Sequence, residues 1–190
     1  MSAKSRDATS INWESSEIAE RRNRGRARRA ELQRPATEMM LDLAEIRLGS
    51  RVLDLAAGTG DQTVLVAQRV GPTGYVLATD ISASMLKLAA DAAREEGLTN
   101  VETKVMDAPK IDLEADSFDA VVCQLGLFLF SNPAGVLGAM RRVVRPRGKV
   151  APLVFSTPEK NPYQGTVLSV ARRFWMQYST LILSRRNQYA

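Results

Sequence analysis

The stretch RVLDLAAGTGDQT, residues 51–63, decides the fold. Arg51–Ala57 is a short apolar run of strand length, and a Gly58-Thr59-Gly60 turn leads from it into Gln62–Val70, whose apolar residues have helical spacing. The pattern predicts a strand, a tight loop and a helix. Glycines in such a loop let the backbone approach a ligand closely, and the helix start presents unpaired N–H groups.

The same alternation of strands and helices continues along the chain. Ser82 or Ser84 can cap a helix over residues 85–96 that Gly97 ends, and a further helix is expected over Ala134–Val144. The strands expected around these helices are Tyr75–Thr79, Val101–Met106, Phe118–Gln124 and Lys149–Phe155. Near-continuous apolar strands that alternate with helices require a parallel sheet covered on both faces. The predicted class is therefore α/β, with a doubly wound, mostly parallel sheet.

Composition limits the chemistry that the chain can perform. The 190 residues suffice for one core, and no apolar run reaches the roughly 20 residues of a membrane helix. The first residues lack the apolar stretch of a secretory signal, so we expect a cytoplasmic protein. The only cysteine, Cys123, lies in an apolar run and is expected to be a buried small hydrophobe. Histidine is absent, which excludes catalytic triads and metal sites built on imidazole.

Positive charge is concentrated near the N-terminus. Seven of the arginines lie between Arg21 and Arg34. We interpret residues 1–35 as a basic arm or helix closed by Pro35, either solvated or in contact with nucleic acid. Residues 36–160 are then the folded domain, which opens with a helix capped by Thr37 that carries Met39, Met40, Leu43 and Ile46 toward the sheet. Residues 161–190 are expected to form a helix, Gly165–Met176, and a tail with one short strand, Thr180–Ser184.

Acidic residues at the strand ends point to a nucleoside ligand. Asp80 ends the second strand 20 residues after Gly60, the spacing at which a carboxylate accepts hydrogen bonds from ribose hydroxyls. Asp107 and Ala108 end the third strand, where a carboxylate and a backbone N–H can hold adenine. The alternatives are a helix-capping role for Asp80 and a turn role for Asp107.

The charge of the loop favours one cofactor over another. A dinucleotide loop has a third glycine where this chain has Thr63, and its pyrophosphate would be repelled by Asp61. S-adenosylmethionine carries no phosphate, and its ammonium and sulfonium are cations that Asp54 and Asp61 could offset. We therefore expect S-adenosylmethionine as the cofactor.

Five motifs in this order, VLDLAAGTGDQT (52–63), ATDIS (78–82), VMDA (105–108), SFDAVVCQLGL (117–127) and RVVRPRGKV (142–150), resemble class I S-adenosylmethionine-dependent methyltransferases. The resemblance is strongest to the ubiquinone/menaquinone biosynthesis C-methyltransferase branch, in which alanine likewise replaces the first loop glycine, here at Ala56. It covers residues 36–160 and implies a Rossmann-like core with strand order 3-2-1-4-5.

The resemblance also assigns roles to single residues. It implies that Asp54, Gly58, Gly60 and Thr63 line the methionine end of the cofactor, and that Gln124 contacts it from the fourth strand. With the ribose and adenine positions and their neighbours, the predicted cofactor-binding set is Asp54, Ala56, Gly58, Thr59, Gly60, Asp61, Thr63, Asp80, Ile81, Met85, Asp107, Ala108 and Gln124. No catalytic residue and no metal site are assigned.

The C-terminal part departs from that family. Its members continue past the fifth strand through two more strands, whereas the tail of this chain does not resemble that continuation, so we expect these strands to be missing or reduced. The fifth strand would then form an apolar edge and favour a homo-oligomer. Three functions stay open: methyl transfer to a small molecule by direct displacement, a cofactor-binding module without turnover, and methylation of RNA held by the basic arm.

Overall fold

The computed structural model describes residues 11–161. The chain divides into two compact units, Met1–Val154 and Phe155–Ala190, and of the second unit only its first residues are described, with the short helix η3 (Pro158–Lys160). The helix and strand predicted for the tail therefore lie outside the described residues. The division of the chain at residues 35 and 160 stays a prediction. None of the helices within residues 11–161 is long and apolar enough to cross a membrane.

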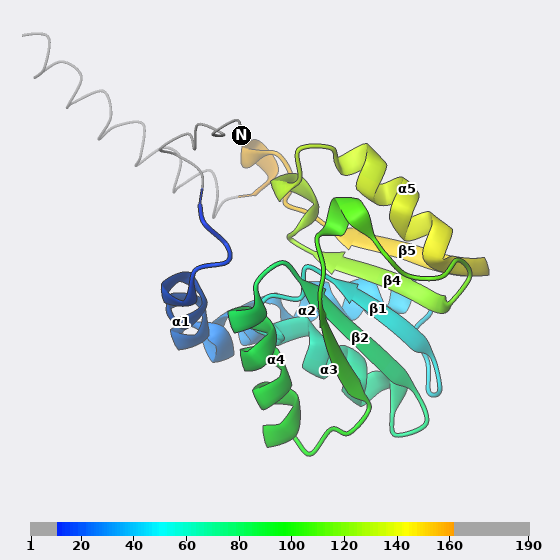
Figure 1. The fold of residues 1–190 in the computed structure, drawn as a ribbon, viewed down its shortest axis with the longest axis horizontal. Coiled ribbons are helices and arrows are strands. Elements are labelled where there is room, and N and C mark those ends of the chain that lie inside the picture. Colours follow the sequence, from blue (N-terminus) through cyan, green and yellow to red (C-terminus); the bar gives the residue numbers. More distant parts are fainter. Residues whose placement is uncertain (1–10, 162–190) are drawn as a thin grey trace, which may run out of the picture. The chain divides into compact units, whose positions relative to one another are not determined.

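The first unit alternates helices and strands, as the sequence predicted (Figure 1). Its elements are α1 (Ser16–Arg24), α2 (Arg26–Leu43), β1 (Arg51–Leu55), α3 (Asp61–Val70), β2 (Tyr75–Asp80), α4 (Ala83–Glu95), β3 (Val101–Val105), η1 (Ala108–Lys110), β4 (Phe118–Gln124), η2 (Leu127–Leu129), α5 (Pro133–Val143) and β5 (Val144–Leu153).

The five strands form one sheet in the order β3-β2-β1-β4-β5, and every neighbouring pair is parallel. This is the predicted doubly wound, Rossmann-like order. Strand order reverses at β1, which pairs with β2 on one side and β4 on the other. In open parallel sheets ligands bind beyond the carboxyl ends of the strands at this reversal. The glycine loop after β1 lies at that place.

Two hydrophobic layers enclose the sheet. One contains side chains of α2 and α3, with Leu41, Val66 and Val70 packed on Val52 and Val122 of the sheet. The other layer contains side chains of α5. Its Val136 and Met140 belong to one buried cluster with Leu53 and Val121, which alternate along β1 and β4 with the residues of the first layer. Figure 1 shows α2 and α3 behind the sheet, and α5 on its other side. Because both faces are covered, the inner strands are apolar along almost their whole length.

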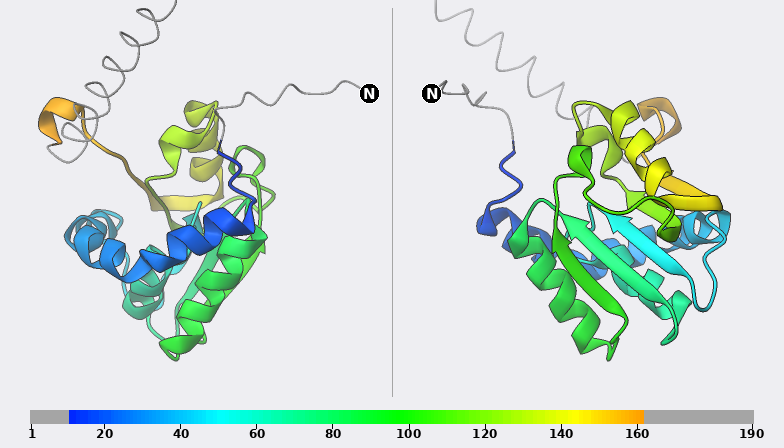
Figure 2. Two further views of the ribbon diagram at one scale, coloured as in Figure 1. Left: turned by 90° about the vertical axis from the view of Figure 1, so that its left-hand side faces the viewer. Right: turned by 45° about the vertical axis from the view of Figure 1, so that its right-hand side comes forward.

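The helix expected to start at Thr37 starts eleven residues earlier. α2 runs from Arg26 to Leu43 with Pro35 inside it, so Pro35 does not end a helix and the prediction that Thr37 caps one is wrong. The apolar face is also shifted, because Met40 is buried whereas Met39 is 64% exposed. Ahead of α2, helix α1 packs against α4 (Figure 2). The N-terminal segment is therefore part of the packed structure from Ser16 onward.

The last strand also differs from its prediction. β5 begins at Val144 rather than Lys149, and its pairing with β4 shifts register between Phe118 and Ala120. Pro146 and Gly148 are residues typical of turns, but they lie within β5, where the irregular register accommodates them. Among residues 11–161, no strand pairs with the outer edge of β5.

Candidate cofactor site

The glycine loop has a left-handed backbone at three positions: Ala56 (φ 57°), Gly58 (φ 58°) and Gly60 (φ 83°). A Cβ added at Gly60 would lie 2.8 Å from the Cα of Ala89 on α4, so only glycine lets the loop lie this close to that helix. A Cβ added at Gly58 would meet only the Sδ of Met85, at 4.0 Å. Gly60 therefore serves packing, and Gly58 leaves free the space that faces it.

Asp54 lies beneath this loop at the end of β1 and is completely buried. Thr63 Oγ1 donates to Asp54 Oδ2 at 2.6 Å, and Gln62 Nε2 donates to Asp54 Oδ1. Burial raises the pKa of the Asp54 carboxyl to about 7, despite these two hydrogen bonds, which lower it. The carboxyl ties the end of β1 to the first turn of α3 and fixes the path of the loop. Thr63 belongs to the predicted set, whereas Gln62 does not.

Asp80 holds the other side of the loop. Its Oδ2 accepts the Gly58 N–H at 2.9 Å, and its Oδ1 accepts the Ser82 N–H at 2.9 Å. A carboxylate has about four lone-pair positions, so two remain for further donors. The residue that caps α4 is Ser82, whose Oγ accepts the Met85 N–H at 3.3 Å. The alternative that Asp80 serves as that helix cap is therefore wrong.

The third strand brings Asp107 and Ala108 to the same end of the sheet. Ala108 is buried and begins η1, whereas Asp107 is half-buried and makes no side-chain cap to that helix. Within residues 11–161 the Asp107 carboxylate has no hydrogen-bond partner, so its lone pairs are available. Ile81 directly follows the end of β2 and is 40% exposed. Met85, in the first turn of α4, has a buried side chain whose Sδ faces Gly58 of the loop.

Gln124 ends β4 and is held by α2. Thr37 Oγ1 donates to Gln124 Oε1 at 2.8 Å, and Gln124 Nε2 donates to Gln33 Oε1 at 2.8 Å. Both ends of the Gln124 amide are thus occupied by side chains of α2. Neither Gln33 nor Thr37 belongs to the predicted set.

The most important residue missed in the sequence is Arg29, from the arginine-rich segment. Its Nε donates to Asp61 Oδ2 at 2.5 Å and its Nη2 to Thr59 Oγ1 at 2.9 Å. Its Nη1 donates to the carbonyl oxygen of Arg22 at 3.0 Å. One side chain thus joins both N-terminal helices to two residues of the glycine loop, and it offsets the negative charge of Asp61.

Arg22 lies beside Arg29 and faces the same loop. Its pKa is lowered, first by burial and then by the charge of Arg29, while Asp61 and Asp80 act in the opposite direction. The guanidinium carbon of Arg22 lies 5.8 Å from the ring centroid of Trp13, within range of a cation–π contact. The arginine-rich segment therefore covers the loop.

Part of the arginine-rich segment stays free of intramolecular partners. Arg26 pairs with Glu95 of α4 at 3.5 Å, and Arg34 pairs with Glu38 one turn along α2 at 2.8 Å. The exposed arginines without a partner among the described residues are Arg21, Arg24 and Arg28. Contact with nucleic acid through this segment stays a prediction.

Cys123 is buried as expected, and burial raises the pKa of its thiol to about 12. Gly126, just after β4, lies close to it, because a Cβ added there would meet Cys123 Sγ and the Cβ of Ala56, each at 2.9 Å. The segment after β4 therefore packs directly on the start of the glycine loop. Residues at the ends of β1, β2 and β4 thus lie against the glycine loop, and Asp107 lies after β3 at the same end of the sheet.

Comparison with known proteins agrees with this arrangement. Residues 33–189 match the ubiE/COQ5 methyltransferase family. The chain belongs to that family. The match begins inside α2 and takes in the whole sheet and the tail, so that the glycine loop and the strand ends described above all lie within it, whereas Arg29 lies outside it.

Individual relatives are similar over the same region. The chain is 39% identical over 122 residues to the ubiquinone/menaquinone biosynthesis C-methyltransferase UbiE of Pseudomonas aeruginosa, which covers 64% of this chain and 48% of that protein. It is 41% identical over 119 residues to the UbiE of Pseudomonas savastanoi, which covers 62% and 46%. The chain thus spans about half the length of these family members.

Solved structures share the fold. A SAM-dependent methyltransferase from Aquifex aeolicus superimposes with a TM-score of 0.54 at 28% identity, over 58% of each chain. The YcgJ protein from Bacillus subtilis superimposes with a TM-score of 0.61 at 25% identity, over 74% of this chain and 58% of that one. The Rossmann-like class I methyltransferase fold expected from the sequence is confirmed.

Proposed function

We propose that this chain binds S-adenosylmethionine on the glycine loop and transfers its methyl group to a small-molecule acceptor. The observation that carries the proposal is the position of Asp80. Its carboxylate accepts the Gly58 N–H and has two lone-pair positions left beside the open side of the loop. The hydroxyls of a ribose are the donors that such a carboxylate pairs with in Rossmann-like folds.

The other groups around the loop fit the remaining parts of this cofactor. Asp107 has a carboxylate without a partner among the described residues and is suited to accept from the adenine amino group. Asp61 and Arg29 place one negative and one positive charge side by side. That pair matches the ammonium and carboxylate of the methionine end. Of its five N–H groups, the guanidinium of Arg29 uses three in the contacts described, so two remain.

A dinucleotide fits this site less well. Asp54 and Asp80 lie at the loop, and Asp61 stands in the first turn of α3, where a pyrophosphate would have to approach. Arg29 offsets the charge of Asp61, and burial raises the pKa of the Asp54 carboxyl to about 7, so the repulsion of a pyrophosphate rests mainly on Asp80, which forms no ion pair within residues 11–161. Asp61 and Asp54 therefore repel a pyrophosphate less than the sequence indicated.

The bound cofactor supplies a methyl group on a positively charged sulfur, which can be displaced directly by a nucleophile. The chain's own contribution is to hold the cofactor in one orientation through Asp80, Asp107 and the Arg29–Asp61 pair, and to exclude water with α1 and α2. No residue of the described chain needs to form a covalent bond. This suits a sequence without histidine.

The relatives are named for ubiquinone and menaquinone biosynthesis, and we propose an acceptor of the same class, a carbon of a reduced quinone-type ring. Two experiments test the function, the first for cofactor binding and the second for methyl transfer. Calorimetric titration of the full chain with S-adenosylmethionine, with its demethylated product and with NAD should give binding for the first two only. Incubation with radiolabelled S-adenosylmethionine and demethylated quinols should give labelled product. Binding of NAD alone would overturn the cofactor assignment, and cofactor binding without turnover would favour a binding module.

A further inference from the structure

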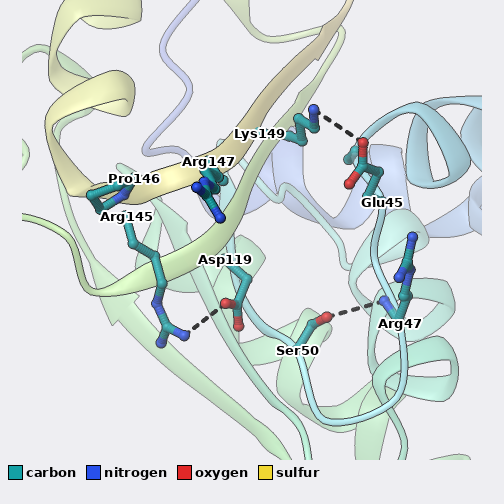
Figure 3. Close-up of a pocket in the computed structure, with 10 residues that line it drawn as sticks. Glu45, Arg47, Ser50, Asp119, Arg145, Pro146, Arg147 and Lys149 are labelled. Carbon is teal, nitrogen blue, oxygen red and sulfur yellow. Dashed lines mark hydrogen bonds and ion pairs between the residues drawn. The ribbon is translucent and has the colours of Figure 1, made fainter.

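A cavity of about 260 Å³ lies at the opposite end of the strands from the glycine loop (Figure 3). It is formed where the segment between α2 and β1 meets the second residue of β4 and the first half of β5. The residues that line it are Ala44, Glu45, Arg47, Ser50, Asp119, Arg145, Pro146, Arg147, Gly148 and Lys149. Ligands of parallel α/β sheets normally bind at the carboxyl ends of the strands. This cavity is therefore separate from the candidate cofactor site.

The lining carries more positive than negative charge. Two of its four basic residues are paired, Lys149 with Glu45 at 3.0 Å and Arg145 with Asp119 at 2.7 Å. These two pairs use both acidic residues of the lining. The guanidinium groups of Arg47 and Arg147 are left without a partner among the described residues. In Figure 3 the Arg147 side chain is drawn between the two ion pairs.

The backbone at Arg147 has an unusual conformation for an arginine. Its φ is +70°, in the left-handed region, where a residue with a Cβ is strained and glycine is not. The next residue, Gly148, presses this turn onto β4, because a Cβ there would lie 2.5 Å from the carbonyl oxygen of Asp119. Packing therefore fixes the turn, and the chain places a long cationic side chain at a position where glycine would be less strained. Strain of this kind is concentrated at functional sites.

We infer that this cavity is a binding site for a phosphate or diphosphate group. Two unpaired guanidinium groups can hold phosphate oxygens through paired N–H donors, and the two neighbouring ion pairs keep their acidic partners from competing for them. The volume is slightly below the roughly 300–1,000 Å³ of sites that enclose a drug-sized molecule. It accommodates the anionic group of a ligand whose remainder lies outside the mouth. The inference does not rest on the proposed methyl transfer.

Titration of the full chain with inorganic diphosphate tests the inference directly. We expect saturable one-site binding, which Arg147→Gly weakens at least tenfold. This variant is informative because glycine relieves the left-handed strain, so the fold should melt no lower than the native protein. Arg47→Gln removes the second free guanidinium and should weaken binding to a similar extent. Affinity for S-adenosylmethionine should be unchanged in both variants.

A matched control separates a built site from general attraction to a basic protein. Arg28→Gln removes one exposed and unpaired arginine outside the cavity, so it lowers the net charge as much as either test variant. Diphosphate affinity should stay at the native value in this control. No binding by the native chain, or equal weakening in all three variants, overturns the inference.

Two parallel binding experiments distinguish a soluble phosphate compound from a lipid headgroup as the source of the phosphate group. In one, the chain is titrated with free diphosphate, and in the other it is sedimented with phosphatidylcholine vesicles with and without phosphatidic acid. Arg147-dependent binding in the first arm alone assigns the site to a soluble phosphate compound. Arg147-dependent capture by the acidic vesicles assigns it to a lipid headgroup.

Discussion

Arg29 lies directly against Asp61, with its Nε 2.5 Å from Oδ2, across 32 residues of sequence. The arginine belongs to α2 and the aspartate to the first turn of α3, so this contact fastens the N-terminal helices to the glycine loop. Both side chains are partly shielded, with 22% and 14% exposure, and the pair is thus better protected from solvent than a surface ion pair. The packing of the N-terminal helices and the position of the glycine loop are coupled through it.

Arg29→Ala should weaken S-adenosylmethionine binding about tenfold, because the cation that pairs with Asp61 is lost together with two donors for the methionine carboxylate. The fold should survive with a loss of about 1–2 kcal/mol of unfolding free energy. Calorimetry and thermal melts measure the two effects separately. Arg28→Ala is the control, because the side chain of Arg28 is exposed although it directly precedes Arg29. Equal affinity in both variants would show that the pair is only structural.

Asp80→Asn should weaken S-adenosylmethionine binding by about 2 kcal/mol, or roughly 30-fold, because hydrogen bonds to a charged acceptor are replaced by weaker ones. The shape is conserved, and one amide oxygen still accepts the Gly58 or Ser82 N–H. Asp112→Asn, at an exposed position, controls for the change in net charge. Retention of native affinity in calorimetry would remove Asp80 from the ribose position.

The buried carboxyl of Asp54 makes stability depend on pH in an identifiable window. Its pKa is about 7 in the folded chain against 3.8 when exposed. Between these values the folded chain keeps the proton and the unfolded chain has released it. The unfolding free energy therefore falls as pH rises from about 4 to about 7, by about 4 kcal/mol at most, and this contribution is constant above that range.

Asp54→Asn isolates this effect. Other titrating groups are common to both proteins and cancel when the unfolding free energy of the variant is subtracted from that of the native chain at each pH. We expect this difference to decline between pH 4 and 7, as measured by urea denaturation. A difference that does not change with pH would show that Asp54 is ionised in the folded protein.

The inner part of the sheet could be predicted from sequence because β1, β2 and β4 are buried on both faces. β4 is found at the predicted residues, and the carboxyl ends of β1 and β2 are within two residues of theirs. Asp80 ends β2 and Asp107 lies two residues after β3, so both could be placed at the carboxyl edge of the sheet, where ligands of parallel sheets bind.

The N-terminal helices could not be predicted in the same way. Pro35 normally ends a helix, but here Arg29 on one side and Thr37 on the other are both held by distant partners, which keeps α2 continuous through it. Local patterns contain no information on such contacts. A run of arginines also indicates a solvated face far more often than a contact with a specific carboxylate. The position of Arg29 was therefore visible only in the structure.

The two loop glycines should respond differently to alanine. Gly58→Ala requires a left-handed alanine with room for its Cβ, so it should cost about 1–2 kcal/mol of stability and weaken cofactor binding by filling the open side of the loop. Gly60→Ala adds a collision with Ala89 of α4 and should cost about 1–3 kcal/mol more. Urea denaturation and calorimetry on both variants test this. Equal loss of stability would show that the loop moves away from α4 without cost.

The outer edge of β5 pairs with no other strand within residues 11–161. Leu125 N–H donates to the Leu153 carbonyl at 2.8 Å, so Leu153 turns its polar groups toward β4. Because successive residues of a strand face opposite ways, the preceding Pro152 faces the outer side, where its lack of an N–H removes one donor from the edge. The edge is thus partly protected against pairing with another strand.

We therefore expect weak, reversible self-association of the native chain through β5, and stronger association when Pro152→Val restores the donor. Valine also favours an extended backbone, so the variant strand should pair more readily with a second copy. Sedimentation velocity over a concentration series measures both proteins, and Ala151→Val serves as the control, because it adds a β-branched side chain at a position whose N–H already faces β4. Two strictly monomeric proteins at the highest concentration would show that another part of the chain covers this edge. Equal association of both valine variants would instead assign the effect to side-chain bulk rather than to the restored hydrogen bond.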